Sequence, residues 1–358
     1  MDSTIQDIKF DENGYCQYCT RFFQKKNARN PILPMERNLK LSELLVDIKK
    51  RNSKPYDCII GLSGGADSSY VIHLALELGL RPLVVHLDNG WNSELATFNI
   101  NNLLNVTGFD LYTHVIQWEE YKDLQRSFIK ANVVDIELLM DHAMIATLFK
   151  TASKYGIKHI LTGINNSTEG FNFPAGWSHF KFDAKNILAI HQTFGSFKRL
   201  KTYPYIRLYK YIYYRYIKKI RMISFLDFVD YNKEKAIKLL EEKYNYRKYE
   251  KKHYENIFTR FYQAYILPKK FKIDKRIVHL SNLICTAQMK REDAINELQK
   301  DPYDKPEDLK LDYEFVLKKL EMSLPEFERY LSTPEKNHRD YPNEYELYRK
   351  LRFLIYKY

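Results

Sequence analysis

The sequence predicts an α/β fold, a doubly wound parallel sheet followed by a mostly helical C-terminal region. Short apolar runs alternate with helix-like segments between residues 55 and 195. These runs end at small or polar residues typical of turns, and from residue 227 onward the pattern is helical. Alternation of this kind implies parallel strands with helices on both faces. We therefore divide the chain into an N-terminal preamble (1–54), an α/β domain (55–195) and a helical region (196–358).

The elements follow from the spacing of apolar residues. Strands are expected where apolar and β-branched residues cluster, at 57–62, 82–86, 110–116 and 158–162. Helices are expected between them, at 68–78, 92–105, 119–130 and 138–155. An amphipathic helix at 37–52 leads into the first strand, and charged helices are expected at 232–243, 290–298 and 307–330.

Composition narrows the class of protein. The chain has 358 residues with 45% hydrophobic content, enough for a sizeable core. Its net charge of +12 suits an anionic ligand, either a nucleotide, a nucleic acid, a nucleotide sugar or a membrane surface. No apolar run is long enough to span a bilayer, and the polar first residues are unlike a signal peptide. With four cysteines and no export signal, we expect a cytoplasmic protein.

The turn after the first expected strand carries the strongest motif, Ser-Gly-Gly-Ala-Asp-Ser-Ser at 63–69. Unpaired N–H groups at a helix start attract anions, and Gly64 and Gly65 let the backbone approach a phosphate. The glycine spacing fits neither a Walker A loop nor a dinucleotide-binding fingerprint. The pattern Ser-Gly-Gly-x-Asp-Ser resembles the PP-loop of the ATP pyrophosphatase superfamily, whose fold is of the adenine nucleotide α-hydrolase type. This resemblance implies that ATP is split between its α and β phosphates.

Two other strand ends carry candidate residues, because ligands of parallel sheets bind beyond the carboxyl ends of the strands. Asp88 could accept a ribose hydroxyl or reach Mg²⁺ through water, or it could simply shape an Asn-Gly turn. Gly163 follows the fourth strand, and Glu169 nearby is either a substrate or metal ligand or a solvated loop carboxylate.

Basic clusters occur in the helical region. Residues 184–226 contain no acid, and 209–222 interleave tyrosine with lysine and arginine. This stretch fits a nucleic-acid or membrane surface, or a packed helix joining domains, which we favour. The cluster at 269–276 could neutralise a leaving pyrophosphate, or it could be a solvated basic face.

The preamble contains Cys16-x-x-Cys19, which is half of a structural zinc site. No second pair lies nearby in the sequence, and Cys58 and Cys285 stand alone in apolar surroundings that suggest core residues. Zinc at Cys16 and Cys19 is therefore expected to have an incomplete ligand set.

Taken together, several stretches resemble the N-acetyl sugar amidotransferases of bacterial surface-glycan pathways, a branch of the PP-loop superfamily. They are Phe-Asp-Glu-Asn-Gly-x-Cys-x-Tyr-Cys at 10–19, the loop at 63–68, Asp-Asn-Gly-Trp-Asn at 88–92, Gly163 with Asn-Ser-Thr-Glu-Gly at 166–170, Lys-His-Tyr-Glu with Phe-Thr-Arg-Phe at 252–261, Leu-Pro-Lys-Lys-Phe-x-Ile-Asp-Lys-Arg at 267–276, and His-Leu-Ser at 279–281. The block from 252 to 281 singles out this branch. Members usually carry an earlier cysteine pair and a serine where Asn256 stands. This sequence lacks that pair, either because its start was chosen late or because this member has lost half of the site.

The resemblance implies an ATP- and Mg²⁺-dependent synthetase subunit for lipopolysaccharide O-antigen or flagellin glycans. It would convert the acetamido group of a nucleotide-linked or acidic sugar to an acetamidino group and release AMP and pyrophosphate. Ammonia would come from a partner resembling the glutaminase and cyclase subunits of imidazole glycerol phosphate synthase. No glutaminase triad is identifiable in this chain.

The resemblance also implies roles for individual residues. The ATP-binding set is Ser63, Gly64, Gly65, Asp67, Ser68, Ser69, Asp88, Asn89 and Gly163. The catalytic set is Asp67, His253, Glu255 and Arg260. The residues for substrate or pyrophosphate are Asn166, Glu169, Lys269, Lys275 and Arg276, and those for zinc are Cys16 and Cys19.

Two other functions are compatible with the sequence. A tRNA-modifying PP-loop enzyme would use the basic tyrosine-rich stretch, but thiolases of that kind need a cysteine near the loop, and Cys58 lies inside the first strand. We therefore expect no nucleic-acid partner. A non-catalytic scaffold that binds a nucleotide would form no AMP.

Overall fold

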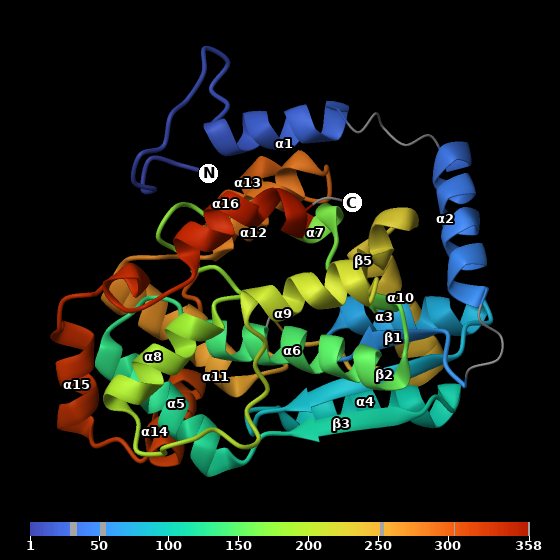
Figure 1. Cartoon of the computed structure of the whole chain (residues 1–358). Helices are drawn as coiled ribbons and strands as arrows, with labels where there is room; N and C mark the ends of the chain where they lie inside the picture. Colours follow the sequence, from blue (N-terminus) through green and yellow to red (C-terminus); the bar gives the residue numbers. More distant parts are fainter. Residues whose placement is uncertain (29–33, 51–54, 251–253, 304, 357–358) are drawn as a thin grey trace.

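A five-stranded parallel sheet forms the centre of the computed structural model, which describes residues 1–28, 34–50, 55–250, 254–303 and 305–356. The strand order is β3-β2-β1-β4-β5, and every neighbouring pair is parallel (Figure 1). The strands are β1 (Cys58–Gly61), β2 (Pro82–Asp88), β3 (Leu111–Val115), β4 (His159–Thr162) and β5 (Arg221–Ser224). Because the chain winds outward in both directions from β1, the sheet is doubly wound, as predicted, and its switch point lies at the tip of β1.

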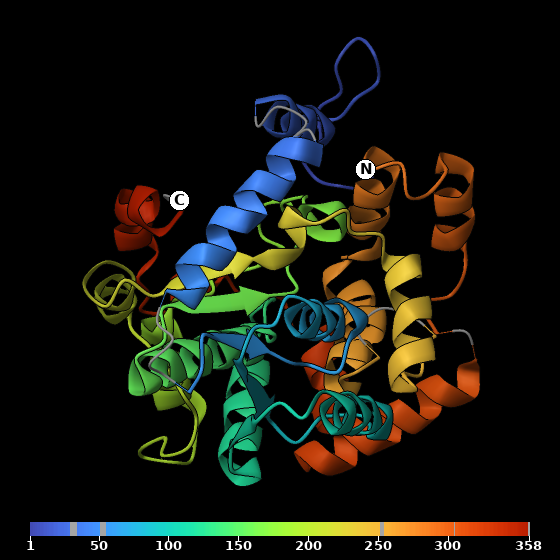
Figure 2. The ribbon, with the colours of Figure 1, turned by 90° about the vertical axis from the view of Figure 1, so that its right-hand side faces the viewer.

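Helices cover both faces of the sheet, and Figure 2 looks along the strands between them. Alternate residues of β1 face opposite sides: Ile60 packs with one set of helices and Ile59 with the other. The first set is α2 (Pro34–Lys49), α3 (Ala66–Glu77), α4 (Glu94–Thr107) and α10 (Lys233–Tyr244). The second set is α6 (Leu138–Tyr155), α9 (Leu208–Ile212) and the π-helix η1 (Tyr213–Ile217). Burial on both faces explains why the inner strands β1, β2 and β4 are mostly apolar, whereas the edge strands β3 and β5 carry polar and exposed residues.

A second core joins the loop after β2 to the C-terminal helices. Trp91, from that loop, packs in one cluster with Phe128, Phe261 and Phe327. The helices around this core are α5 (Trp118–Ala131), α8 (Ala184–Phe194), α11 (Ile257–Phe261), the π-helix η3 (Tyr262–Phe271), α14 (Pro306–Leu320) and α15 (Leu324–Ser332). The C-terminal region is thus packed directly against a strand-end loop of the sheet.

The remaining elements are short or peripheral. They are α1 (Gln17–Ala28), α7 (Asn166–Glu169), η2 (Phe225–Phe228), α12 (Arg276–Cys285), α13 (Arg291–Gln299), η4 (His338–Asp340) and α16 (Tyr345–Tyr356). Phe22 of α1 stacks on Phe171, with 5.0 Å between ring centres, and Val278 of α12 completes this small cluster.

The structure differs from the sequence expectations in two segments. The stretch 209–222 forms no long helix: α9 and η1 end at Ile217, and Arg221–Ser224 adds β5 to the sheet beside β4. The sheet therefore extends past residue 195, and the division at 54/55 and 195/196 stays a prediction. The segment 307–330 forms two helices, because Glu321 adopts a left-handed φ of 51° and Ser323 caps a new helix.

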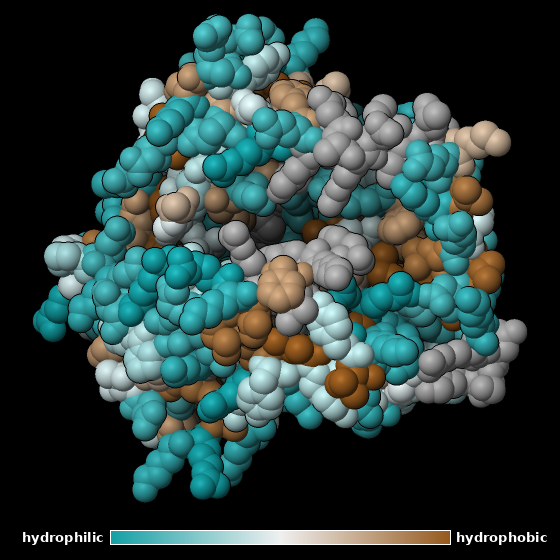
Figure 3. Space-filling view, turned by 45° about the horizontal axis from the view of Figure 1, so that its top comes forward, coloured by the Kyte–Doolittle hydropathy of each residue, from teal (hydrophilic) through white to brown (hydrophobic). Residues whose placement is uncertain are grey.

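Figure 3 shows a surface that is mostly hydrophilic, with hydrophobic residues gathered below its centre. Within the described ranges, no helix combines the length and apolar character needed to cross a membrane.

Candidate functional site

Hydrogen bonds of its own serines shape the loop between β1 and α3. The Ser63 and Ser68 hydroxyl oxygens lie 3.2 Å apart, and the Gly65 N–H donates to the Ser63 hydroxyl at 3.3 Å. Gly65 is the N-cap of α3, and no side chain caps this end of the helix. The first-turn N–H groups and the positive end of the helix dipole are therefore available to an anion.

Two glycines allow close approaches that a side chain would block. Gly64 has a φ of +85°, and a Cβ there would lie 3.0 Å from the carbonyl oxygen of Ala96. Gly163, just after β4, packs so closely that a Cβ would lie 2.8 Å from the backbone N of Ser68. The predicted Ser63, Gly64, Gly65, Asp67, Ser68, Ser69 and Gly163 are thus brought together at the tips of β1 and β4.

Asp67 is held by two residues that the sequence analysis missed. The Tyr231 hydroxyl donates to Asp67, and Lys233 Nζ lies 3.7 Å from Asp67 Oδ2. Burial and the neighbouring carboxylate raise the pKa of Tyr231. Both partners follow β5, near the start of α10, where no motif marks them in the sequence.

The loop after β2 is shaped by its own side chains. Asp88 Oδ1 accepts the Gly90 N–H at 2.8 Å, which forms the expected turn. Asn89 is buried and accepts the Trp91 N–H at 3.1 Å. Asn89 therefore holds the loop in shape, and Asp88 stands at its edge.

Lys319 of α14 fixes this loop from outside. Its Nζ donates to the Gly90 carbonyl and lies 4.8 Å from the Trp91 ring centre and 4.7 Å from that of Trp118. Burial lowers the pKa of Lys319. This residue was also missed, since one lysine among the several of a charged helix carries no signal.

The loop after β4 is hydrogen-bonded to two other parts of the chain. The Asn166 N–H donates to Asp227 Oδ1 at 2.7 Å, and Asn282 of α12 donates to the Ser167 carbonyl at 2.8 Å. Asn166 and Glu169 are both exposed.

The segment starting at Tyr254 reaches the loop between β1 and α3. Glu255 Oε1 lies 3.7 Å from where a Cβ on Gly65 would stand, and the Glu255 carbonyl accepts the Ser93 N–H at 3.0 Å. The Asn256 side chain caps α11 by accepting the Thr259 N–H at 2.9 Å. Asparagine and serine are both good N-caps, so this departure from the family pattern leaves capping intact. His253, the other residue predicted here, lies outside the described residues.

The remaining predicted cations have partners elsewhere in the fold. Arg260 forms a two-pronged ion pair with Asp312 of α14 and stacks over Tyr254 at 4.7 Å. Lys275 pairs with the buried Glu137. Two further cations bond locally, Lys269 to Tyr265 at 3.1 Å and Arg276 to Asp274 and the end of α13. Their roles toward substrate or pyrophosphate stay predictions.

The cysteines are arranged differently from the prediction. Cys16 Sγ lies 3.4 Å from Cys19 Sγ, and Cys285, predicted to be a lone core residue, reaches Cys19 at 4.0 Å. The bond with Cys285 and burial raise the pKa of Cys19. Even so, no group of three or more His, Cys, Asp or Glu suited to a metal ion occurs in the described part of the chain, so zinc at Cys16 and Cys19 finds no support.

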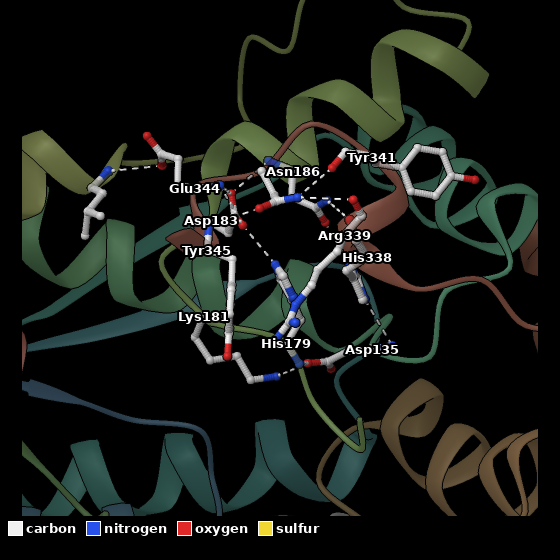
Figure 4. A network of polar contacts seen from close by, with 12 residues as sticks. Asp135, His179, Lys181, Asp183, Asn186, His338, Arg339, Tyr341, Glu344 and Tyr345 are labelled. Carbon is white, nitrogen blue, oxygen red and sulfur yellow. Dashed lines mark hydrogen bonds and ion pairs between the residues drawn. The ribbon is translucent and has the colours of Figure 1, made fainter. Parts of the chain in front are cut away.

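A buried polar network ties the C-terminal segment to the α6–α8 region (Figure 4). Asp135 accepts the His179 N–H at 2.6 Å and Lys181 Nζ at 2.7 Å. His338 stacks on His179, with ring centres 4.4 Å apart, and bonds to Asn186 at 2.7 Å. This network holds the two segments in one arrangement.

The comparisons with known proteins concern the C-terminal part and the fold. Residues 255–352 match the family model described as LPS biosynthesis protein WbpG-like, C-terminal domain. No curated protein matches the chain. Solved structures similar to it include the NMN synthetase of Francisella tularensis, at 18% identity and a TM-score of 0.31, covering 59% of this chain and 93% of that one. Another is an NH3-dependent NAD synthetase of Campylobacter jejuni subsp. jejuni, at 16% identity and a TM-score of 0.29, covering 43% and 72%.

The two structural similarities have TM-scores below 0.5 and carry no weight here. The fold is established by the chain's own parallel sheet and by the loop at its switch point. The family match begins at Glu255, within the block on which the resemblance depended, and confirms it. Residues 255–352 are therefore similar to the C-terminal domain of WbpG-like LPS biosynthesis proteins, and in this chain they are joined to a parallel sheet that carries the Ser-Gly-Gly-Ala-Asp-Ser loop.

Proposed function

We propose that this chain is the synthetase subunit of an ATP-dependent sugar amidotransferase, which converts an acetamido group on a nucleotide-linked or acidic sugar to an acetamidino group. The observation that carries the proposal is the closeness of Glu255 to Gly65, whose Cβ, if it had one, would lie 3.7 Å from the Glu255 carboxylate oxygen. Glu255 is the first residue of the region that matches the WbpG-like C-terminal domain, and Gly65 belongs to the proposed ATP-binding loop.

The residues present fit ATP with Mg²⁺. Gly64 and Gly65 leave backbone space for a phosphate, and the start of α3 offers N–H donors that no side chain caps. Asp67 and Asp88 supply the oxygen ligands that Mg²⁺ prefers, directly or through water. When bound, Mg²⁺ neutralises charge on the phosphates during displacement.

The reaction needs ATP because an amide carbon is a poor electrophile. The acetamido oxygen attacks the α phosphorus, the bond from that phosphorus to the β-phosphate oxygen breaks, and pyrophosphate leaves. Ammonia then attacks the activated carbon, the C–O bond to AMP breaks, and loss of a proton gives the acetamidino group. In this scheme Ser63, Ser68 and the start of α3 hold the phosphates, and Lys233 adds a positive charge beside Asp67.

Glu255 is proposed to take up a proton from the attacking ammonia, and the position of its carboxylate beside the loop supports this role. Asn166, Glu169 and Lys275 are proposed for the sugar side. His253, Arg260, Lys269 and Arg276 stay secondary candidates for the amide, the acidic sugar or pyrophosphate. We further propose that ammonia comes from a separate glutaminase partner.

The test is a reaction of the full chain with ATP, Mg²⁺, ammonium and a panel of nucleotide-linked acetamido sugars, followed by mass spectrometry. We expect one sugar to show the small mass loss of an oxygen-to-NH exchange, with an equal amount of AMP. Glu255→Gln should lower the rate of this exchange, whereas Glu250→Gln, a nearby exposed position, should not. ATP binding without AMP formation from any sugar would indicate a scaffold and contradict the proposal.

A further inference from the structure

The helical segment formed by α9 and η1 has one buried and one exposed side. Leu208, Tyr211 and Tyr214 are buried in the cluster against the sheet. On the outer side, Tyr209 is 67% exposed and Ile217 is 69% exposed. The outer side of this segment therefore presents an aromatic and an aliphatic side chain to solvent, two types of residue found at membrane interfaces.

The same segment is strongly basic. No Asp or Glu occurs from residue 184 to 226, whereas Lys210, Lys218 and Lys219 lie within or directly after the helical segment. Lys210 Nζ lies 4.6 Å from the Tyr213 ring centre and 5.4 Å from that of Tyr214. Cations therefore border the exposed apolar side chains.

The C-terminal helix α16 extends this surface. Figures 1 and 2 show α16 and α9 side by side at one side of the molecule. The Leu208 N–H donates to Glu344 at 3.4 Å, and Tyr348 stacks on Phe180 at 3.9 Å, which fixes α16 in place. Leu347 and Phe353 are exposed at 46% and 61%, and Lys350 is exposed between them.

We propose that this α9/α16 face, defined by Tyr209, Lys210, Ile217, Lys218, Leu347 and Phe353, docks on an anionic lipid surface. Aliphatic and aromatic side chains would enter the interface between headgroups and acyl chains, while lysines reach anionic headgroups. A nucleic acid fits less well, because Ile217 and Leu347 cannot stack on bases as aromatic residues do. The proposal is independent of the reaction proposed above.

Sedimentation with vesicles tests the proposal. The full chain is expected to bind vesicles of phosphatidylcholine mixed with phosphatidylglycerol, but not vesicles of phosphatidylcholine alone, and to bind less as salt rises. Lys210→Glu combined with Lys218→Glu should weaken binding at least about tenfold, since each basic residue near the surface contributes roughly 1 kcal/mol. The matched control, Lys235→Glu with Lys238→Glu, changes charge equally on exposed positions of α10 and should bind like the unmodified chain.

A second variant keeps the charge. Ile217→Ser should also weaken binding to the anionic vesicles, with an unchanged melting temperature because this side chain is exposed. Equal binding to both kinds of vesicle, no binding to either, or equal effects of the two double variants would overturn the proposal. A higher affinity for tRNA than for anionic vesicles at the same salt, measured by mobility shift and lost in the Lys210→Glu, Lys218→Glu variant, would also overturn the proposal.

Discussion

Glu255 and Gly65 lie close together although 190 positions separate them in the sequence, and Glu255 Oε1 is 3.7 Å from where a Cβ on Gly65 would stand. One residue opens the WbpG-like region and the other caps the helix that would hold phosphate. The Tyr249 hydroxyl adds a bond of 3.1 Å to the Gly64 carbonyl. Residues C-terminal to the sheet thus form one wall of the proposed site.

Gly65→Ala should separate nucleotide binding from folding. Gly65 has an ordinary φ of −75°, and a Cβ there would meet the Ser63 hydroxyl at 3.4 Å, which the fold tolerates. The methyl group would occupy the space that a phosphate needs, so ATP affinity should fall about tenfold or more, equivalent to ~1.4 kcal/mol. Calorimetry measures the affinity. Gly61→Ala, whose Cβ would be 3.4 Å from Leu148, is the control and should bind ATP normally.

Gly163→Ala should instead disturb the loop itself. The added Cβ would be 2.8 Å from the backbone of Asp67 and Ser68, so the loop or the tip of β4 must move. We expect a loss of about 1–3 kcal/mol in the free energy of unfolding, together with loss of AMP formation. Denaturant unfolding followed by fluorescence measures the first. An unchanged unfolding midpoint would show that the two strand ends are not packed as described.

Lys319→Met removes a charge and keeps the length of the side chain. It deletes the bond to the Gly90 carbonyl and the contacts of the ammonium group with Trp91 and Trp118. We expect about 1–2 kcal/mol of destabilisation and a higher KM for ATP, with a smaller change in kcat. Lys318→Met, at the exposed neighbouring position, should change neither. Identical kinetics for the two variants would contradict a positioning role for Lys319.

Acid should destabilise the fold through buried neutral histidines. His142 donates from Nδ1 to the Lys181 carbonyl at 2.8 Å and accepts the Ile206 N–H at Nε2, so neither nitrogen has room for a further proton. Burial lowers the pKa of His142 to about 4 from 6.5. Because the unfolded chain binds this proton at higher pH, the free energy of unfolding should fall as pH drops from 6.5 to about 4.

The loss from His142 alone is about 3 kcal/mol over that range. His338, whose pKa burial lowers to about 3, acts in the same direction. Thermal unfolding at pH 7.5, 6.0 and 4.5 measures the effect, and His142→Asn should be less stable at pH 7.5 but less sensitive to acid. A midpoint independent of pH between 7.5 and 4.5 would contradict this description of the histidine environment.

The sequence predicted the sheet well where local pattern decides structure. The segments 57–62, 82–86, 110–116 and 158–162 match β1 to β4 to within one or two residues at each end. β1, β2 and β4 are short, mostly apolar runs, β3 is a short β-prone run at the sheet edge, and all four end near turn residues, so their signal is local. The loop at 63–69 could be predicted for the same reason. Glycine and serine between a strand and a helix form a local pattern that indicates a phosphate-binding loop.

What the sequence could not predict depends on distant contacts. β5 lies in a basic tyrosine-rich stretch, and only pairing with β4 makes Arg221–Ser224 a strand. Tyr231, Lys233 and Lys319 reach the site from helices or turns far along the chain, and no spacing rule connects them to it. The meeting of Cys285 with Cys19 likewise joins α12 to α1 across 266 positions.

The most direct test of the central claim is the nucleotide product formed from ATP. The full chain is incubated with ATP, Mg²⁺, ammonium and acetamido sugars, and the products are separated by ion-exchange chromatography. Our account predicts AMP and pyrophosphate from the unmodified chain. It predicts none from Asp67→Ala, which should keep the fold, since the Asp67 carboxylate is partly exposed and, within the described residues, its loss leaves Tyr231 and Lys233 without this partner. Formation of ADP and phosphate, or AMP formation retained by Asp67→Ala, would contradict the assignment of residues 63–69 as the site of ATP cleavage.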